Sequence, residues 1–461
     1  MLFNSISFLC FFPVVVGIYF LVPKTARYLW LLFASYYFYM SQNPGFALLL
    51  LLTTVITYAS GLMLSALSQE SKPKADCLKK WVVFGSVFAN LGILFMCKYI
   101  PFHLFVPVGI SFYTFQALSY TIDVYRRKAE AEKNFFRYAL YVSFFPTILS
   151  GPIQRAADFL PQLKALAQKK LWDEKRIANG LFFMLWGYFL KLVLADRIAV
   201  FVNAAYAGYE SLGSGVLALA AVLYAFQIYC DFAGYSCIAI GAGTVMGFTL
   251  MRNFDAPYLA GSVKEFWRRW HISLSSFLRD YLYIPLGGSR CSRLCKYRNI
   301  MIIFLVSGMW HGVGLHYLVW GGLNGFFQVC EDAFSAVRRR LPCKRLLTFI
   351  VASFTWVFFR AESVSRAVHV CLGVCRISGS HVRQLLEMGL GRTDVLVLAI
   401  AIAVLIVADL LHEKGSSFTA WLLQRKIGVR YAVYLAVCMV LLLQVVADFG
   451  QPAASFLYFQ F

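Results

Sequence analysis

Residues 299–330 read NIMIIFLVSGMWHGVGLHYLVWGGLNGFFQVC and contain no Lys, Arg, Asp or Glu. Strongly basic segments flank this stretch: 264–298 holds eight Lys and Arg against two acidic residues, and 335–345 reads SAVRRRLPCKR. Lys and Arg of membrane proteins collect in the loops that stay on the cytoplasmic side. Both flanking segments are therefore predicted to face the cytoplasm, and residues 299–334 to leave it and return as a hairpin of helices.

The composition of the whole chain predicts that such apolar helices recur. Of 461 residues, 60% are hydrophobic and only 14% are charged, whereas soluble domains are about 25% charged. Because a bilayer core takes about 20 apolar residues per helix, we expect an all-α multi-pass membrane protein, one domain over 1–461, with about 10 to 12 spans and some re-entrant or interfacial helices. The apolar stretches lie at 6–22, 27–41, 45–66, 81–98, 136–150, 178–206, 213–230, 233–249, 299–319, 320–334, 345–360, 393–412 and 429–448.

Charge and cysteine content argue against several other classes. The net charge of +21 is explained by basic loops beside anionic lipid, because no basic domain outside the apolar stretches is present to bind nucleic acid. The twelve cysteines are scattered, and Cys291 and Cys295 lack the two-residue spacing of structural zinc sites. We expect no metal site, no bound cofactor and no nucleic-acid partner, and we expect the first apolar stretch to be a retained helix.

His311 lies near the middle of the apolar hairpin, next to Trp310. A helix running straight from Arg298 would carry it about 18 Å into the membrane, at about 1.5 Å per residue. An ionisable side chain at that depth is costly unless it faces the protein interior or a water-filled cavity. Depth alone leaves two interpretations open: a functional residue, or a histidine that donates a hydrogen bond to a neighbouring helix.

Residues 262–288, SVKEFWRRWHISLSSFLRDYLYIPLGG, show a second pattern. Aromatic and apolar side chains and His271 recur at the three- and four-residue spacing of one helix, while Arg268 and Arg279 fall on another face. Such a helix lies along the cytoplasmic interface or enters the membrane partway, and PLGG ends it. One interpretation is an amphipathic anchor. The other is a cationic mouth for a phosphate-bearing donor, with His271 turned inward and Arg269 beside Arg268.

Carboxylates and amides also stand in apolar surroundings. Asp196 in LVLADRIA and Asp231 in YAFQIYCDFAGYS each require a partner or a wet cavity. Gln227 and Tyr229 line the same cavity or simply tie helices together. We count Gln227, Tyr229 and Asp231 among the candidates for a donor channel.

Three stretches resemble one known family. YCDFAGYSCIAIG, NFDAPYLAGSVKEFWRRWHISLSSFLRDYLYIPLGG and GMWHG are similar to the motifs of the membrane-bound O-acyltransferase family, most closely its bacterial branch that acetylates alginate and similar exported polysaccharides. The resemblance covers a core of about 1–330, which includes PVGISFYTFQALSYTIDVYR and FFPTILSGPIQR. The C-terminal helices of 331–461 match only in being hydrophobic.

The resemblance implies an architecture and roles for several residues. The family places a ring of helices around a thin centre, where a cytoplasmic donor and an outside acceptor meet at a buried histidine. His311 of WHG is then the base toward the acceptor hydroxyl as that hydroxyl attacks an acyl thioester, and Trp310 supports it. His271 of RRWHIS positions the donor or shapes its channel. Asp196 of ADRIA orients the site or balances its charge.

The function implied is O-acetylation. We expect transfer of an acetyl group from a cytoplasmic thioester, acetyl-CoA in the first instance, toward an exported cell-envelope polysaccharide in a bacterial inner membrane. Expected partners are membrane lipid, the glycan acceptor and a periplasmic or extracellular acyltransferase. The same fold would also suit D-alanyl transfer to teichoic acid from a carrier protein, or acetylation of peptidoglycan. A proton-coupled transporter using His311, Asp196 and Asp231 is a different class, but no internal repeat supports it.

Overall fold

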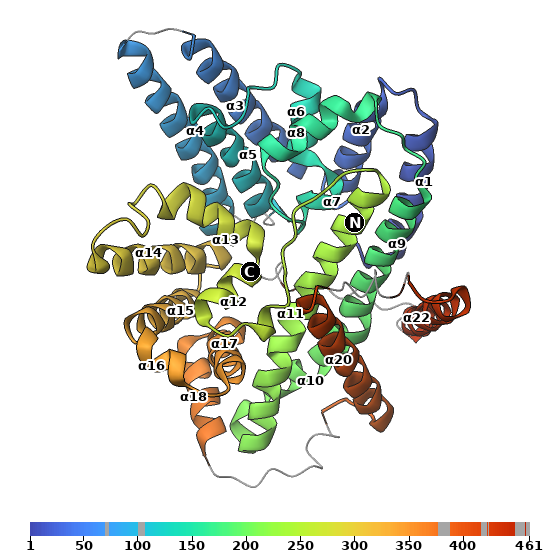
Figure 1. Cartoon of the computed structure of the whole chain (residues 1–461), viewed down its shortest axis with the longest axis vertical. Coiled ribbons are helices and arrows are strands. Elements are labelled where there is room, and N and C mark those ends of the chain that lie inside the picture. The colour runs from blue at the N-terminus through green and yellow to red at the C-terminus, as the bar shows by residue number, and fades with distance from the viewer. Residues whose placement is uncertain are drawn as a thin grey trace. The chain divides into compact units, whose positions relative to one another are not determined.

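A computed structural model describes residues 1–69, 73–99, 107–376, 388–415 and 424–447, together with Leu422 and Leu457 (Figure 1). Within these residues the chain is helical and contains no strand, so the expected all-α class is confirmed. The chain divides into two compact units: 1–184 with 236–252, and 185–235 with 253–461. The chain passes from one unit to the other within α9 (Glu174–Tyr188), within α11 (Ser214–Val245) and between Arg252 and Asn253.

The first unit is built around tyrosine and phenylalanine side chains. Tyr138 donates a hydrogen bond to Thr57 Oγ1 at 2.7 Å, and its ring lies 4.4 Å from that of Tyr120. Hydroxyls buried in this way bond to partners in the protein because an unsatisfied donor is costly. Its other helices are α1 (Ile6–Leu21), α2 (Arg27–Met40), α3 (Phe46–Leu67), α4 (Pro73–Tyr99), α5 (Ile110–Tyr125), α6 (Phe135–Ser143), α7 (Phe145–Ile148) and α8 (Ala156–Lys164).

The second unit carries every charged or imidazole residue singled out above. It contains a π-helix, η2 (Phe189–Ala195), followed directly by α10 (Asp196–Ala207). Its further helices are α12 (Val263–Arg269), α13 (Ile272–Leu278), η5 (Arg279–Tyr283), α14 (Arg293–His311), α15 (Leu315–Ala333), α16 (Ser335–Arg340), α17 (Lys344–Arg360), α18 (Val364–Cys375), α20 (Arg392–Glu413) and α22 (Ile427–Ala447).

Five helical segments of the described chain are long and apolar enough to cross a membrane. They are Phe46–Leu67, Pro73–Tyr99, Glu174–Ala207, Ser214–Val245 and Arg392–Glu413. The other helices are shorter or less hydrophobic, so the expected total of about 10 to 12 spans stays a prediction.

Two of the predicted divisions between apolar stretches are wrong, and a third, within the hairpin, is misplaced. The stretches 213–230 and 233–249 form one helix, α11, because the Asp231 carboxylate that seemed to interrupt the run is neutralised by Lys191 Nζ at 2.6 Å. The stretch 136–150 is two helices, α6 and α7, because the chain turns at Phe144 and Pro146 begins a new helix, where its missing N–H costs nothing.

The hairpin predicted for 299–334 is confirmed as α14 and α15. Its turn lies at residues 312–314 and not at 319–320, so His311 is the last residue of α14. Glycines let the two backbones approach: a Cβ at Gly308 would overlap the Tyr317 carbonyl oxygen, and one at Gly321 would overlap the Phe304 carbonyl oxygen. Small residues at such crossings allow close packing of membrane helices.

The single helix expected over 262–288 is broken at its centre. Ser262 caps α12 by accepting from the Glu265 N–H at 2.9 Å, and the helix ends at Arg269. His271 then adopts a left-handed backbone with φ +43° before α13 begins. The separate aromatic and cationic faces predicted from one continuous helix are therefore wrong.

The glycine contact in the hairpin generates a stability prediction. Gly321→Ala should lower the melting temperature of the detergent-solubilised protein, because overpacking a close contact costs about 1–3 kcal/mol. The adjacent Gly322→Ala is the matched control, since its Cβ would lie 3.9 Å from Leu305 Cδ2, an ordinary contact. Equal melting temperatures for the two variants would contradict the packing described for α14 and α15.

Candidate active site

One face of α14 lines a cavity of about 740 Å³ in the second unit. The lining residues recur every three or four positions, which places them on the same side of the helix. The face begins with a cation and ends with an imidazole; it comprises Lys296, Ile300, Ile303, Phe304, Ser307 and His311. At about 1.5 Å per residue, α14 carries this lining over about 22 Å.

The opposite walls come from α12, α13 and the α15–α17 region. Trp267, Trp270, His271 and Leu274 bring aromatic and apolar surface to the cavity. The walls opposite α14 also contribute cations and carboxylates, which are Lys264, Arg268, Arg279, Glu331, Asp332, Arg338 and Lys344. The cavity thus combines an apolar lining with charged groups and two histidines, which is the usual composition of a small-molecule site.

The structure brings both predicted histidines to this one cavity. His271 is 1% exposed and His311 is 4% exposed. Both contact the Trp310 ring, with centroids 5.9 Å from His271 and 4.8 Å from His311. The His311 ring also meets Trp320 and Phe359 edge to face, each at 5.1 Å. Trp310, predicted as a supporting residue, therefore packs against both imidazoles.

His271 is held in its left-handed conformation by a neighbouring extended segment. The Asp255 N–H donates to the Arg269 carbonyl at 3.1 Å, and the Ile272 N–H donates to the Asn253 carbonyl at 2.9 Å. Ser273 Oγ also donates to Asn253 Oδ1 at 2.7 Å. Asn253 was missed from the sequence, where the only signal was its place in the NFDAPYLAG motif.

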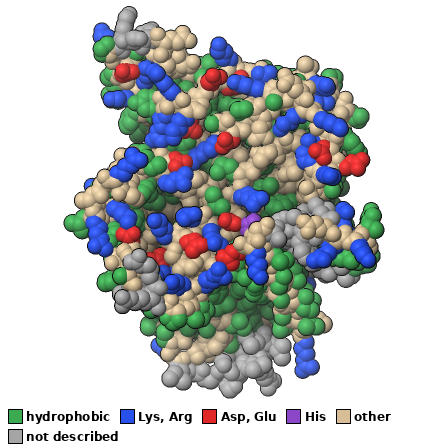
Figure 2. Space-filling model, viewed as in Figure 1, with side chains coloured by type: hydrophobic (Ala, Val, Ile, Leu, Met, Phe, Trp, Pro, Cys, Tyr) green, Lys and Arg blue, Asp and Glu red, His purple; other side chains and the backbone are tan. Residues whose placement is uncertain are grey.

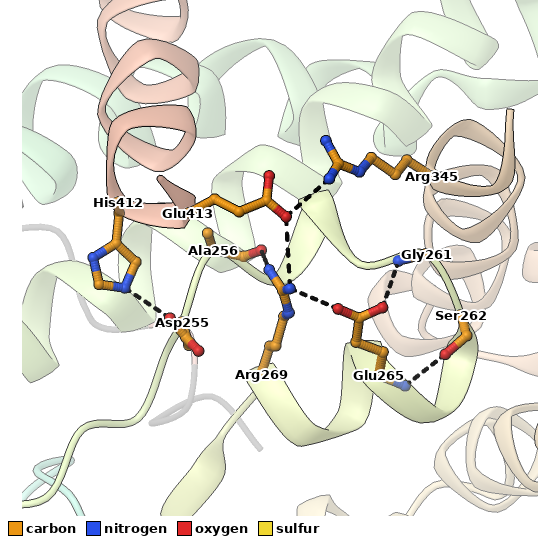
Figure 3. Close-up of polar contacts among 9 residues, drawn as sticks. All are labelled: Asp255, Ala256, Gly261, Ser262, Glu265, Arg269, Arg345, His412 and Glu413. Atoms are coloured by element: carbon orange, nitrogen blue, oxygen red, sulfur yellow. Dashed lines mark hydrogen bonds and ion pairs between the residues drawn. The ribbon is translucent and has the colours of Figure 1, made fainter. Parts of the chain in front are cut away.

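The same segment is tied to the end of α20 by charged groups (Figure 3). His412 Nε2 lies 2.7 Å from Asp255 Oδ1. Arg269 Nη2 lies 2.6 Å from a Glu265 oxygen and 3.6 Å from Glu413 Oε1. Arg269 is therefore engaged by carboxylates and does not line the cavity, and its expected place in the donor channel stays a prediction.

The cavity cations fall into two groups. Lys296 pairs with Asp332 at 2.6 Å, Arg279 pairs with Asp280 at 2.8 Å, and Arg338 pairs with Glu331. Lys264, Arg268 and Lys344 form no side-chain ion pair with any residue that the structure describes. Figure 2 shows Lys and Arg outnumbering Asp and Glu on the face it presents. Three cations thus remain for an anionic ligand.

Asp196 and Asp231 lie in a different cluster. Both bind Lys191 Nζ, at 2.8 and 2.6 Å, and Lys191 is only 1% exposed. A buried cation of this kind is strongly destabilising when a partner is removed. Tyr229 donates instead to Asp409 at 3.2 Å.

None of these side chains lines the cavity, and neither does buried Gln227. The structure thus does not bring Gln227, Tyr229 and Asp231 to this cavity, and their donor-channel role stays a prediction; Asp196 pairs with Lys191. Lys191 itself was missed, although a lone Lys in the apolar run FLKLVLA was a signal.

The electrostatics of His271 favour a neutral imidazole. Burial lowers the pKa of His271 from 6.5 to about 3, because desolvation disfavours the charged form. At neutral pH this side chain therefore carries no charge. Among the described residues no group of three or more His, Cys, Asp or Glu could hold a metal ion. Imidazoles beside a cationic, partly apolar cavity can transfer protons and form hydrogen bonds.

Comparison with known proteins assigns the class. Residues 31–365 match the MBOAT family, membrane-bound O-acyltransferase. The chain belongs to the membrane-bound O-acyltransferase family, as the motifs around His271 and His311 predicted. It is a multi-pass membrane protein and an O-acyltransferase.

Individual relatives place the chain within that family. It is similar to the probable alginate O-acetylase AlgI of Pseudomonas aeruginosa, with 38% identity over 390 residues, 80% of this chain and 73% of the relative. The peptidoglycan O-acetyltransferase of Helicobacter pylori is 34% identical over 431 residues, covering 82% and 80%. The teichoic acid D-alanyltransferase of Bacillus subtilis is 26% identical over 326 residues, covering 65% and 78%. The expected likeness to the alginate-acetylating branch is confirmed.

The lowered pKa of His271 predicts a pH-dependent stability. Between pH 6.5 and about 3 the unfolded chain binds a proton at this position that the folded protein does not. The free energy of unfolding is therefore highest above pH 6.5, the pKa in the unfolded chain, and decreases as the pH falls toward about 3. His271→Asn should flatten the decline in melting temperature between pH 7.5 and about 5. Exposed His369 provides the control: His369→Asn should keep the wild-type slope, and equal slopes for all three proteins would refute the assignment.

Proposed function

We propose that this protein transfers acetyl groups from cytoplasmic acetyl-CoA toward hydroxyls of an exported cell-envelope polysaccharide, in the inner membrane of a bacterium. The observation that carries the proposal is the single cavity lined by His271, His311 and three cations without carboxylate partners among the described residues. Its volume of about 740 Å³ lies within the usual range of small-molecule sites.

The shape of acetyl-CoA matches the distribution of groups in the cavity. Lys264 and Arg268 are exposed and Lys344 is half-buried, so phosphates placed on them remain near solvent. The apolar face formed by Ile300, Ile303 and Phe304 suits the uncharged arm that follows. The thioester at the end of that arm then reaches the buried histidines. Acetyl-CoA is a substrate in this scheme and not a resident cofactor.

The chemistry of the transfer uses the neutral imidazoles. His311 accepts the proton of the acceptor hydroxyl as its oxygen attacks the thioester carbonyl carbon. A C–O bond forms, the C–S bond breaks, and the proton passes from His311 to the leaving sulfur, so CoA departs as the thiol. His271 stays uncharged and positions the donor, while Trp310 keeps both rings in place.

The relatives support the choice of acyl group and acceptor. The proteins named for acetylation are 38% and 34% identical to this chain, whereas the D-alanyltransferase is 26% identical. This difference supports acetyl as the acyl group and a cell-envelope glycan as its destination. An acyltransferase on the outer side of the membrane is the proposed partner that completes the transfer, in keeping with a base enclosed between the two sides.

The first test is acyl transfer from radiolabelled acetyl-CoA in membranes. His311→Ala should reduce label above background by at least about 100-fold, because general-base catalysis contributes about 10²–10⁴-fold. Protein amounts are matched by immunoblot. Wild-type labelling by the variant would remove His311 from the mechanism. Absence of label with the wild type would refute acetyl-CoA as the direct donor, and transfer from a charged carrier protein would then support the D-alanyl type of reaction.

The cation assignment makes a separate prediction. Arg268→Glu should raise the KM for acetyl-CoA by about 10-fold or more, equivalent to about 1.4 kcal/mol, and should weaken its dependence on ionic strength. Lys426→Glu is the matched control because Lys426 is exposed and does not line the cavity. A KM that rises equally in both variants would indicate a general surface-charge effect and contradict the phosphate site.

A further inference from the structure

We propose that the Ser307 hydroxyl donates a hydrogen bond to the carbonyl oxygen of the bound thioester and stabilises the negative charge that develops there. The inference rests on the proposed function, because it assigns a second catalytic residue to the same cavity. Ser307 was singled out by neither its sequence pattern nor the motifs around it. Its position and its missing hydrogen bond make the case.

Ser307 occupies the same face of α14 as His311, one helical turn earlier. Four residues at about 1.5 Å each place it about 6 Å before His311 along the helix axis. It lines the cavity and is only 6% exposed. The preceding lining residues, Ile303 and Phe304, are apolar. Ser307 is thus the hydroxyl that a thioester meets on this helix immediately before it reaches the imidazole.

The hydroxyl of Ser307 differs from those of three other buried helical serines of this chain. Ser35, Ser60 and Ser143 each donate to the carbonyl four residues earlier, at 2.7 Å. Within the described part of the chain, Ser307 makes no such bond and contacts no other hydrogen-bond partner. The hydroxyl instead faces the cavity, where a ligand group that accepts its proton would supply the hydrogen bond that the helix does not.

Two other serines that line the cavity, both on α13, are already engaged by the protein. Ser275 Oγ donates to the Trp270 carbonyl at 3.1 Å, and Ser276 Oγ donates to the Ser273 carbonyl at 3.0 Å. Gly308, the neighbour of Ser307, faces Tyr317 of α15 instead of the cavity. The hydroxyl still able to donate beside His311 on α14 is therefore that of Ser307.

The reaction needs a donor at this place. When the acceptor oxygen attacks, the thioester C=O becomes a C–O⁻ until the C–S bond breaks, and a donor aimed at that oxygen lowers the barrier. Ser307 keeps its proton throughout and only shares it in the hydrogen bond. His311 handles the acceptor's proton, so the two side chains have separate roles within one turn of α14.

The test compares Ser307→Ala with Ser353→Ala in the acetyl-CoA assay. Ser353 is an equally buried helical serine, 6% exposed, whose enclosed hydroxyl lacks a partner but which does not line the cavity. Ser307→Ala should lower kcat by about 10²–10³-fold with KM for acetyl-CoA changed less than about two-fold, because the bond matters chiefly in the transition state. Ser307→Thr, which retains a hydroxyl, should recover most of the rate, and Ser353→Ala should match the wild type.

Three results would overturn the inference: wild-type kcat for Ser307→Ala, a change in KM alone, or a loss of rate that Ser307→Thr does not recover and that follows a lowered melting temperature. In each of these the wild type still transfers acetyl from acetyl-CoA, so the proposed function survives. Failure of the proposed function appears separately, as absence of transfer by the wild type.

Discussion

The close approach of α14 and α15 is the constraint on which the site depends. Gly308 and Gly321 have no side chains, so each lies against a backbone carbonyl of the other helix. This contact uses one side of α14 and leaves another side to line the cavity from Lys296 to His311. It also brings Trp320 of α15 to within 5.1 Å of the His311 ring. One pair of glycines thereby determines both the cavity lining and the surroundings of the His311 imidazole.

A second constraint acts on His271 through the backbone. A non-glycine residue at φ +43° is strained and persists only when its neighbours hold it. Asn253 supplies two of those contacts, to residues 272 and 273, and Asp255 supplies another, to Arg269. The ion pairs with His412 and Glu413 then join this segment to α20 (Figure 3). The strain ends α12 before His271 and turns the imidazole toward Trp310 and Phe232.

The basic residues of this chain have different roles, which depend on the groups they contact. Lys191 is buried and neutralises the charges of Asp196 and Asp231 through two ion pairs. Arg269 joins two helices through Glu265 and Glu413. Arg268, which directly precedes Arg269 in the chain, lines the cavity. The two adjacent arginines in RRWH therefore have different roles. Residue spacing alone could not distinguish them, because the prediction treated 262–288 as one unbroken helix.

The sequence by itself determined the membrane class, the hairpin of 299–334 and the choice of His271 and His311 as candidate site residues. Hydropathy, basic flanks and short motifs are local properties, so they can be read without the tertiary structure. It placed the turn of the hairpin at 319–320, divided α11 at Asp231 and gave no sign that Gln227, Tyr229 and Asp231 lie away from the cavity that the two histidines line. The tertiary structure decided these points, since the neutralising Lys191 and the stabilising Asn253 lie far along the chain from the residues they hold. Which cations remain for a ligand, and why the Ser307 hydroxyl faces a cavity, likewise depend on contacts between helices that no local pattern encodes.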